Sequence, residues 1–167
     1  MSIDDGCLFV KTDIGKESAG KCASYVLNHY KNVTHVISAG IAGALSPELK
    51  TKDIVVSRNI IDYPADMAYD STGYGRMQPT GTILCSDDIV NNRELKEKLF
   101  AKYGALCVEM ESTGIIRECI RLDVPFTAVK VISDYADGKA LNAIIKNQYD
   151  VTDVLGIYLA ENVKEIA

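Results

Sequence analysis

V-E-M-E-S at residues 108–112 and V-I-S-D-Y-A-D at residues 131–137 are the two stretches that decide the fold predicted for this chain. The first stretch follows an apolar run over 105–108, and the second ends an apolar run over 126–132; both runs are typical of buried strands. The residues between them, 112–122, show helical periodicity. Strand, helix and strand in this order predict two parallel strands, neighbours or near neighbours, with a right-handed crossover.

Two carboxylates are predicted to lie at the same edge of this sheet. Glu111 and Asp134 emerge at the carboxyl ends of the two strands, where open α/β sheets place their ligand sites. Two carboxylates in one crevice suit cleavage of a sugar bond, because one can bind ribose hydroxyls while the other handles a proton. Structural interpretations also exist: Asp134 could cap a turn or helix, and Glu111, with Glu109, could open a helix.

The remainder of the chain alternates predicted strands with predicted helices. A helix with an apolar stripe from Ala19 to Tyr30 follows the turn at Gly15, and a strand after it opens into a glycine-rich loop over 40–43. Residues 63–80 are polar, with Tyr, Gly and Pro, and predict a long loop. Further strands are predicted over 7–10, 33–38, 53–62 and 82–85, and further helices over 92–103 and 142–163. The pattern predicts one α/β domain over 1–167, a three-layer fold with a mostly parallel or mixed sheet.

Composition and charge limit the classes of function. The chain has 167 residues, 47% apolar and 25% charged, with a net charge of −5. Its scattered Lys and Arg predict no nucleic-acid partner, and its longest near-apolar run, 36–45, is too short to cross a membrane. An acidic N-terminus without a leader pattern and five cysteines without a C-x-x-C pair predict a cytoplasmic protein with reduced thiols. No metal-ligand spacing is present, and no metal or cofactor is predicted.

Four further blocks accompany the two stretches: I-G-K at 14–16, S-A-G-I-A-G-A-L-S-P at 38–47, D-I-V-V-S at 53–57 and C-S-D-D at 85–88. Their residues and order resemble the purine nucleoside phosphorylase superfamily, and within it the 5′-methylthioadenosine/S-adenosylhomocysteine nucleosidases. Each block is weakly specific, whereas the set is typical of the superfamily. The resemblance implies a nucleoside phosphorylase-like fold, a purine nucleoside as the small-molecule partner, and a homodimer.

The resemblance implies roles for the residues of the two stretches. Asp134 corresponds to the catalytic acid that protonates the leaving purine, with Ser133 as its hydrogen-bonding neighbour. A carboxyl group does this well only if it is protonated near neutral pH, which burial favours. Glu111 corresponds to the carboxylate that binds ribose, Met110 packs against the sugar, and Glu109 lies close to it.

Other positions depart from the family pattern. Gly40 and Ile41 lie in the segment that approaches the sugar and the nucleophile, and Ile41 stands where the nucleosidases usually have serine. Val90 matches a base-pocket position that is often aromatic, although its segment could also be a plain strand-to-helix turn. Lys130 replaces an arginine that the nucleosidases tend to have. Asp13 is a candidate substitute for a water-activating glutamate, which the family carries on strands that usually precede the matched blocks.

The preferred function is hydrolysis of the N-glycosidic bond of a purine nucleoside, of the adenosine type and with or without a 5′-thio group. One alternative is a non-catalytic nucleoside- or adenine-binding remnant of such an enzyme, which Ile41 favours. The other alternative is a phosphorolytic nucleoside phosphorylase. The segment 63–80 carries Tyr and Met residues of the kind enriched at interfaces, and we expect it to help close the neighbouring subunit's site in a homodimer.

Overall fold

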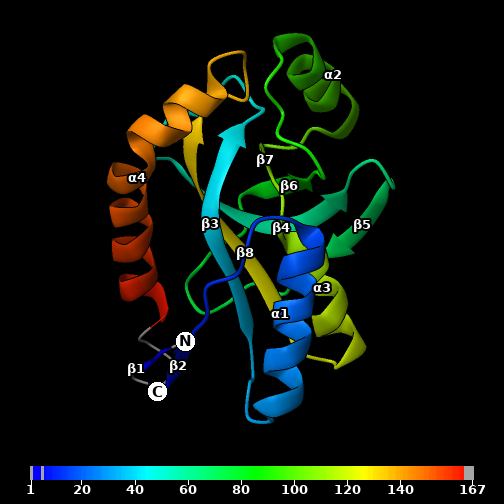
Figure 1. Ribbon diagram of the computed structural model, residues 1–167, viewed down its shortest axis with the longest axis vertical. Coiled ribbons are helices and arrows are strands. Elements are labelled where there is room, and N and C mark those ends of the chain that lie inside the picture. The colour runs from blue at the N-terminus through cyan, green and yellow to red at the C-terminus, as the bar shows by residue number, and fades with distance from the viewer. Residues whose placement is uncertain (1, 5, 164–167) are drawn as a thin grey trace.

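The apolar runs of the sequence pair into a mixed sheet in a computed structural model that describes residues 2–4 and 6–163 (Figure 1). The main sheet has the strand order β5-β4-β6-β7-β3-β8, and β1 and β2 form a separate antiparallel hairpin. The α/β class and the mixed sheet are as predicted. The elements are β1 Ser2–Asp4, β2 Cys7–Phe9, α1 Lys16–His29, β3 Val36–Ala44, β4 Ile54–Asp62, β5 Met67–Asp70, β6 Gly81–Cys85, α2 Arg93–Tyr103, β7 Cys107–Glu109, α3 Ser112–Arg121, β8 Phe126–Asp134 and α4 Ala140–Val163.

The main sheet closes on itself through β4. The first residues of this strand, 54–56, pair antiparallel with β8, while its second half pairs with β6 on one edge and with β5 on the other. Because β8 also pairs with β3, the strands β4, β6, β7, β3 and β8 form a closed circuit. Closure removes open edges and brings the ends of non-consecutive strands together.

The predicted relation between β7 and β8 is wrong in its direction. The two strands are near neighbours, but β3 lies between them and pairs parallel with β8 and antiparallel with β7. The antiparallel contact covers only the end of β3, where Gly43 and Ala44 face Val108 and Cys107. The chain order of β7, α3 and β8 gives no indication that a strand from 60 residues earlier enters between them, because such pairing is non-local.

Two segments predicted as loops contain strand structure. Residues 40–43 continue β3, because both edges of that backbone are hydrogen-bonded, to β8 throughout and to β7 at the end. Gly43 has a packing role there, since a Cβ atom would lie 2.9 Å from an Asp134 carboxylate oxygen. Within 63–80, the strand β5 pairs with β4, so that segment is partly a hairpin.

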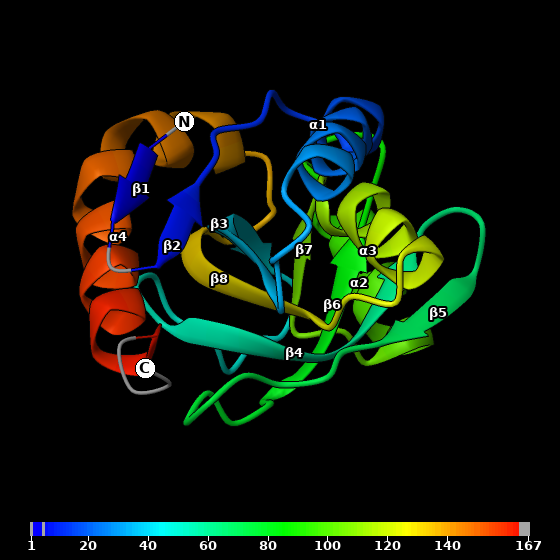
Figure 2. The ribbon, with the colours of Figure 1, turned by 90° about the horizontal axis from the view of Figure 1, so that it is seen from below.

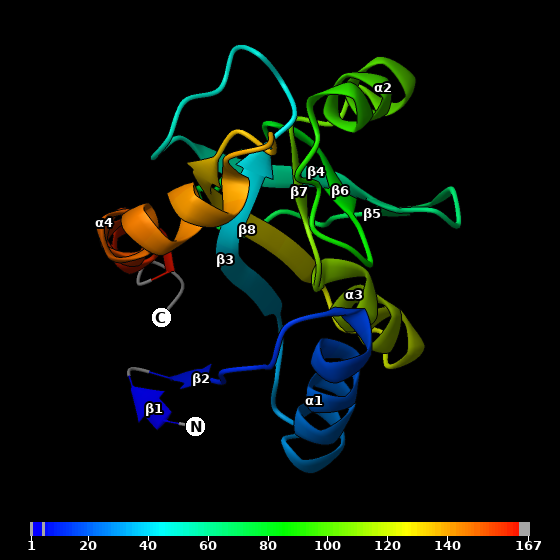
Figure 3. The ribbon, with the colours of Figure 1, turned by 45° about the horizontal axis from the view of Figure 1, so that its top comes forward.

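Helices cover two sides of the closed sheet. The helices α1 and α3 lie against each other on one side, and α4 packs on β8 and β3 on the other (Figure 2). The helix α2 lies at one end of the barrel, where the first turns of α4 also lie (Figure 3). Its limits follow from sequence: Asn92 accepts a hydrogen bond from the Leu95 amide, and Gly104 ends the helix in the left-handed conformation.

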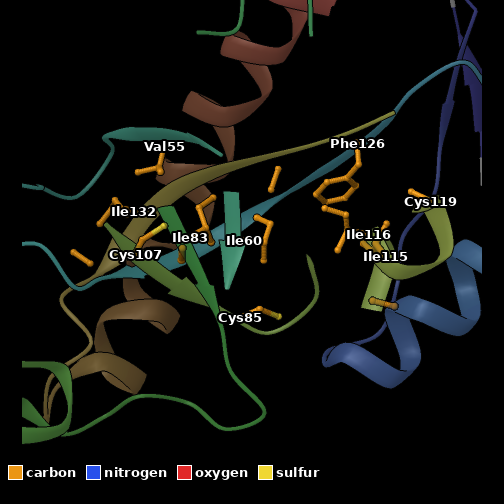
Figure 4. Packing of buried hydrophobic residues seen from close by; sticks show 14 of the residues in the cluster. Val55, Ile60, Ile83, Cys85, Cys107, Ile115, Ile116, Cys119, Phe126 and Ile132 are labelled. Carbon is orange, nitrogen blue, oxygen red and sulfur yellow. The ribbon is translucent and has the colours of Figure 1, made fainter. Parts of the chain in front are cut away.

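The hydrophobic core fills the barrel and the space below α3. Phe126 at the start of β8 packs near Ile116 and Cys119 of α3, while Ile60, Ile83 and Ile132 lie inside the barrel (Figure 4). All six side chains are at most 2% exposed. Burial raises the pKa of the Cys119 thiol to about 12, so this cysteine is an unreactive core residue at neutral pH.

The helices α1 and α3 approach closely at two glycines. A Cβ atom at Gly114 would lie 1.9 Å from the Lys16 carbonyl oxygen, and one at Gly20 would lie 3.1 Å from the Gly114 carbonyl oxygen. The contact therefore fixes the first turn of α1 against the first turn of α3. Both turns adjoin the predicted site.

Substitution at this contact should destabilise the protein. We expect Gly114→Ala to lower the free energy of unfolding by about 1–3 kcal/mol, because overpacking outweighs the better helix propensity of alanine. Gly156→Ala in α4 is the matched control, since no atom lies within 4 Å of its added Cβ and a gain of up to about 1 kcal/mol is expected. Equal stabilities of the two variants in urea unfolding would contradict the packing argument.

Candidate active site

The end of β3 brings the two predicted stretches together. Gly43 is the register partner of both Val108 in β7 and Asp134 in β8. Two strand spacings of about 4.8 Å therefore place these backbones roughly 10 Å apart. Glu111 follows Val108 by three residues, at the start of α3. The site thus lies across β3, with one carboxylate on each side.

Asp134 ends β8 with its carboxylate fixed by its own loop. Its Oδ2 accepts from the Ser133 hydroxyl at 2.7 Å, and its Oδ1 accepts from the Ala136 amide at 2.8 Å. Ala136 reaches this position with a φ of 48°, a conformation that costs a non-glycine residue energy and is often found at functional sites. The Asp134 side chain is buried.

Glu111 is the N-cap residue of α3, directly before Ser112, yet its side chain makes no capping hydrogen bond to that helix. Its Oε1 instead accepts from the Gly15 amide at 3.0 Å, across the α1–α3 contact, and its Oε2 lies 3.3 Å from the Met110 amide. Gly15 has a φ of 100°, which favours glycine. Over residues 2–4 and 6–163, Glu111 makes no ion pair, so its remaining acceptor positions can serve a ligand.

Glu109 is part of a buried ion pair rather than an open ligand site. Its Oε2 lies 2.8 Å from the Lys130 Nζ, and both side chains are at most 2% exposed. It also accepts from the Ser112 amide and hydroxyl, so it opens α3 as the structural interpretation predicted. Lys130 additionally donates to the Ser38 hydroxyl at 3.2 Å.

The two charges of this pair stabilise each other. Burial by itself would raise the pKa of Glu109, but Lys130 outweighs burial and holds that pKa below its ordinary value. Burial by itself would lower the pKa of Lys130, but the negative charges of Glu109 and Glu111 and the hydrogen bond to Glu109 together raise that pKa. Both groups are therefore charged at neutral pH.

Lys16 forms a second network that the sequence interpretation did not assign. Its Nζ donates to Asp62 at 2.6 Å, to the Tyr63 carbonyl at 2.7 Å and to Asp87 at 2.9 Å. Burial lowers the pKa of Lys16, but its hydrogen bonds to these aspartates prevail and raise it. Asp62 also pairs with Arg117 of α3. The network ties α1, β4 and α3 together beside Glu111, and the I-G-K block was the only sequence signal for it.

Three other predicted residues line or flank the same region in different ways. Gly40 and Ile41 lie in β3, and Ile41 packs against the cluster that includes Val151 and Leu155 of α4. Val90 is only 4% exposed and packs with Leu99 of α2. The apolar side chain that this segment exposes is the preceding Ile89, which is 49% exposed.

Met110 and Asp13 flank Glu111. Met110 precedes it directly and is half-buried, and Asp13 is exposed, two residues before Gly15. The assigned roles of these two residues stay predictions, as do those of Gly40, Ile41 and Val90.

Features elsewhere in the described chain do not compete with this site. A hollow of about 400 Å³ lies at the opposite end of β8, lined by apolar residues such as Ile120, Val124 and Phe126, and contains none of the predicted site residues. Among the side chains that the structure describes, no group of three His, Cys, Asp or Glu is arranged to hold a metal ion. In the same part of the chain, no helix has the length and apolar character to cross a membrane.

Several known proteins are similar to this chain. A 5′-methylthioadenosine/S-adenosylhomocysteine nucleosidase from Staphylococcus aureus is 26% identical, with 82% of this chain and 72% of that protein covered. A mutant of the Helicobacter pylori nucleosidase with 5′-methylthioadenosine in its active site matches with a TM-score of 0.84 at 21% identity, over 93% of this chain and 78% of that one. Futalosine hydrolase from the same organism gives 0.82 at 20% identity, with the same coverage.

These structural likenesses show the fold. The sequence profile of the family described as the phosphorylase superfamily matches residues 5–80 and 74–161, which together cover most of the chain. The order of the sequence blocks, the closed mixed sheet and this match agree with one another. The chain belongs to the phosphorylase superfamily.

Proposed function

We propose that this protein cleaves the N-glycosidic bond of a purine nucleoside by hydrolysis. The observation that carries the proposal is the shared register partner Gly43, which holds the Asp134 loop and the Glu111 turn on opposite sides of one strand. The related nucleosidases support the reaction class. Futalosine hydrolase among the similar structures keeps the substituent at the 5′ position open.

Each carboxylate suits one part of this reaction. Cleavage leaves positive charge on the sugar and needs a proton on the departing base, and buried Asp134 can supply that proton. Glu111 can accept hydrogen bonds from two ribose hydroxyls, since its partners in the protein are two amide groups and no cation of the described chain. The Gly15 amide then fixes the direction of that carboxylate.

A binding protein without catalysis is the second candidate. Ile41 supports it, because an alkyl side chain that packs towards α4 cannot orient an attacking water molecule or phosphate. Phosphorolysis is the third candidate. Hydrolysis and phosphorolysis both release the free base, but only phosphorolysis requires phosphate, whereas a binding protein releases no base.

A base-release assay separates the three candidates. Adenosine, inosine, 5′-methylthioadenosine and S-adenosylhomocysteine are each incubated with the protein, with and without phosphate, and free base is measured. Release without phosphate is the expected result. Release that depends on phosphate would indicate a phosphorylase, and calorimetric binding without release would indicate a binding protein.

Glu111→Gln should weaken nucleoside binding selectively. Loss of a charged hydrogen-bond acceptor costs roughly 1.5–3 kcal/mol, so we expect the affinity for adenosine to fall about tenfold or more, with little change for adenine. Glu118→Gln on the same helix is the control, because Glu118 pairs with Arg121 instead. Equal losses for adenosine and adenine in calorimetry would show that Glu111 does not bind ribose.

The homodimer remains a proposal. Within 63–80, the Tyr69 hydroxyl accepts from Arg117 and Met77 is buried in the protein's own core, whereas Met67 is 51% exposed. We expect light scattering to give about twice the chain mass of 18.2 kDa, and Met67→Lys to lower it. The control Ile157→Lys, at a 61% exposed position on α4, should leave the measured mass unchanged. A parent mass near 18 kDa would exclude the dimer.

A further inference from the structure

One exposed aromatic residue adjoins the proposed acid. Tyr135 follows Asp134 directly and is 45% exposed, although Asp134 itself is only 3% exposed. The other exposed aromatic side chains of the described residues are Phe9 on the β1–β2 hairpin and Tyr25 and Tyr30 at the far end of α1. Of these four exposed rings, Tyr135 is the one whose backbone directly follows Asp134.

Lys96 holds the residue in place. Its Nζ donates to the Tyr135 carbonyl oxygen at 2.8 Å and lies 5.9 Å from the centre of the Tyr135 ring. Lys96 belongs to α2, which stands at the same end of the barrel (Figure 3). A cation within about 6 Å of a ring face is attracted to it. The loop after β8 is thereby tied to a rigid helix at the residue next to the acid.

The base position predicted from sequence lacks such a surface. Val90 is buried against Leu99 and presents little area to a ligand. Purine bases bind proteins by stacking on aromatic rings as well as by hydrogen bonds, and stacking is tolerant of base identity because every base has a π-face. A site built to hold a purine next to Asp134 therefore needs an aromatic surface from another element.

We infer that Tyr135 is the surface on which the purine base stacks, and that Lys96 is the residue that positions it. The inference rests on the proposed purine-nucleoside function and adds a specificity determinant to it. Since the ring contacts the π-face, adenine and hypoxanthine nucleosides should both gain from it. Discrimination between bases then falls to the polar groups around Asp134.

The test compares binding of adenine and adenosine by calorimetry. Stacking typically contributes enough for about a tenfold loss on alanine substitution, so Tyr135→Ala should bind both ligands about tenfold more weakly. Tyr135→Phe keeps the ring and should stay within about twofold of the parent. Lys96→Met should lose part of the affinity for both ligands. Tyr25→Ala, a control at a 56% exposed tyrosine on α1, should bind as the parent does.

The outcomes distinguish this inference from the function on which it rests. If the parent binds adenosine, and Tyr135→Ala binds both adenine and adenosine as tightly as the parent does, the stacking role is wrong and the proposed function stands. If Tyr135→Phe loses as much as Tyr135→Ala, the hydroxyl rather than the ring is responsible, and the inference is also wrong. If the parent binds neither ligand and releases no base, both the inference and the proposed function fail.

Discussion

Replacing Asp134 by asparagine is expected to lower turnover of a purine nucleoside at least about a hundredfold, the usual scale for removing a general acid. Asparagine has nearly the same size and can still accept the Ala136 amide hydrogen bond, but it cannot deliver a proton to the leaving base. The measurement is base release under saturating substrate. Because the amide can keep the loop in place, substrate binding should change far less than turnover.

A matched control lies in the same loop. Asp137 accepts a hydrogen bond from the Lys139 amide at 2.9 Å, whereas the Asp134 carboxylate accepts from Ser133 and Ala136. Asp137→Asn should therefore keep turnover close to that of the parent. Near-parental turnover in Asp134→Asn, measured with a nucleoside whose base is a poor leaving group, would remove the acid assignment.

Lys130→Met is expected to destabilise the fold by about 3–5 kcal/mol, because it leaves the Glu109 carboxylate buried without its cation. The Ser112 amide and hydroxyl remain as donors, but they carry no full charge. Urea unfolding at neutral pH measures the loss. Adding Glu109→Gln to Lys130→Met should recover part of the stability, because the unpaired charge is removed. No recovery would show that side-chain packing, rather than charge, is what Lys130 supplies.

The pH dependence of this stabilisation follows from the two shifted pKa values. The pKa of Glu109 lies below its ordinary value of 4.5 in the folded protein, so its contribution is complete above pH 4.5 and is lost as pH falls through the lowered value. The pKa of Lys130 lies above 10.5, so its contribution is complete below pH 10.5 and is lost as pH rises through the raised value. The contribution of this pair to the stability of the parent should therefore be constant between these limits. In Lys130→Met, burial raises the pKa of Glu109, so urea unfolding should show the stability deficit of the variant growing as pH rises above 4.5.

The sequence was sufficient for the elements that carry local signals. The helix after Gly15, the helix capped by Asn92 and the strands before Glu111 and Asp134 were all predicted, because periodicity and capping residues are encoded over a few positions. Their order also placed both carboxylates at strand ends. These predictions located Glu111 and Asp134 without knowledge of which strands are neighbours.

Non-local contacts could not be predicted in the same way. The insertion of β3 between β7 and β8 depends on backbone pairing between residues far apart in sequence, such as Gly43 with Val108 and with Asp134. The glycines of residues 40–43 gave a loop signal although they lie within a strand. The contact of Gly15 with Glu111 joins positions 96 residues apart. The lysine networks are likewise visible only once α1, β4 and α3 are assembled, since no spacing in the chain relates Lys16 to Asp62.

The hydroxyl proton of Ser133 is within hydrogen-bond distance of acceptors in both β8 and β3, and in the proposed reaction this would couple the state of Asp134 to the sheet. Ser133 donates to Asp134 Oδ2 at 2.7 Å or to the Ala42 carbonyl oxygen of β3 at 3.3 Å. The Asp134 Oδ1 faces the Ala136 amide, so in the proposed reaction the transferred proton would come from Oδ2, and the Ser133 hydroxyl would donate to Ala42 before the transfer. In the proposed reaction, transfer of that proton to the base would let the hydroxyl swing back onto the new carboxylate. The serine would thus act as a rotor that stabilises the anion at the moment it forms.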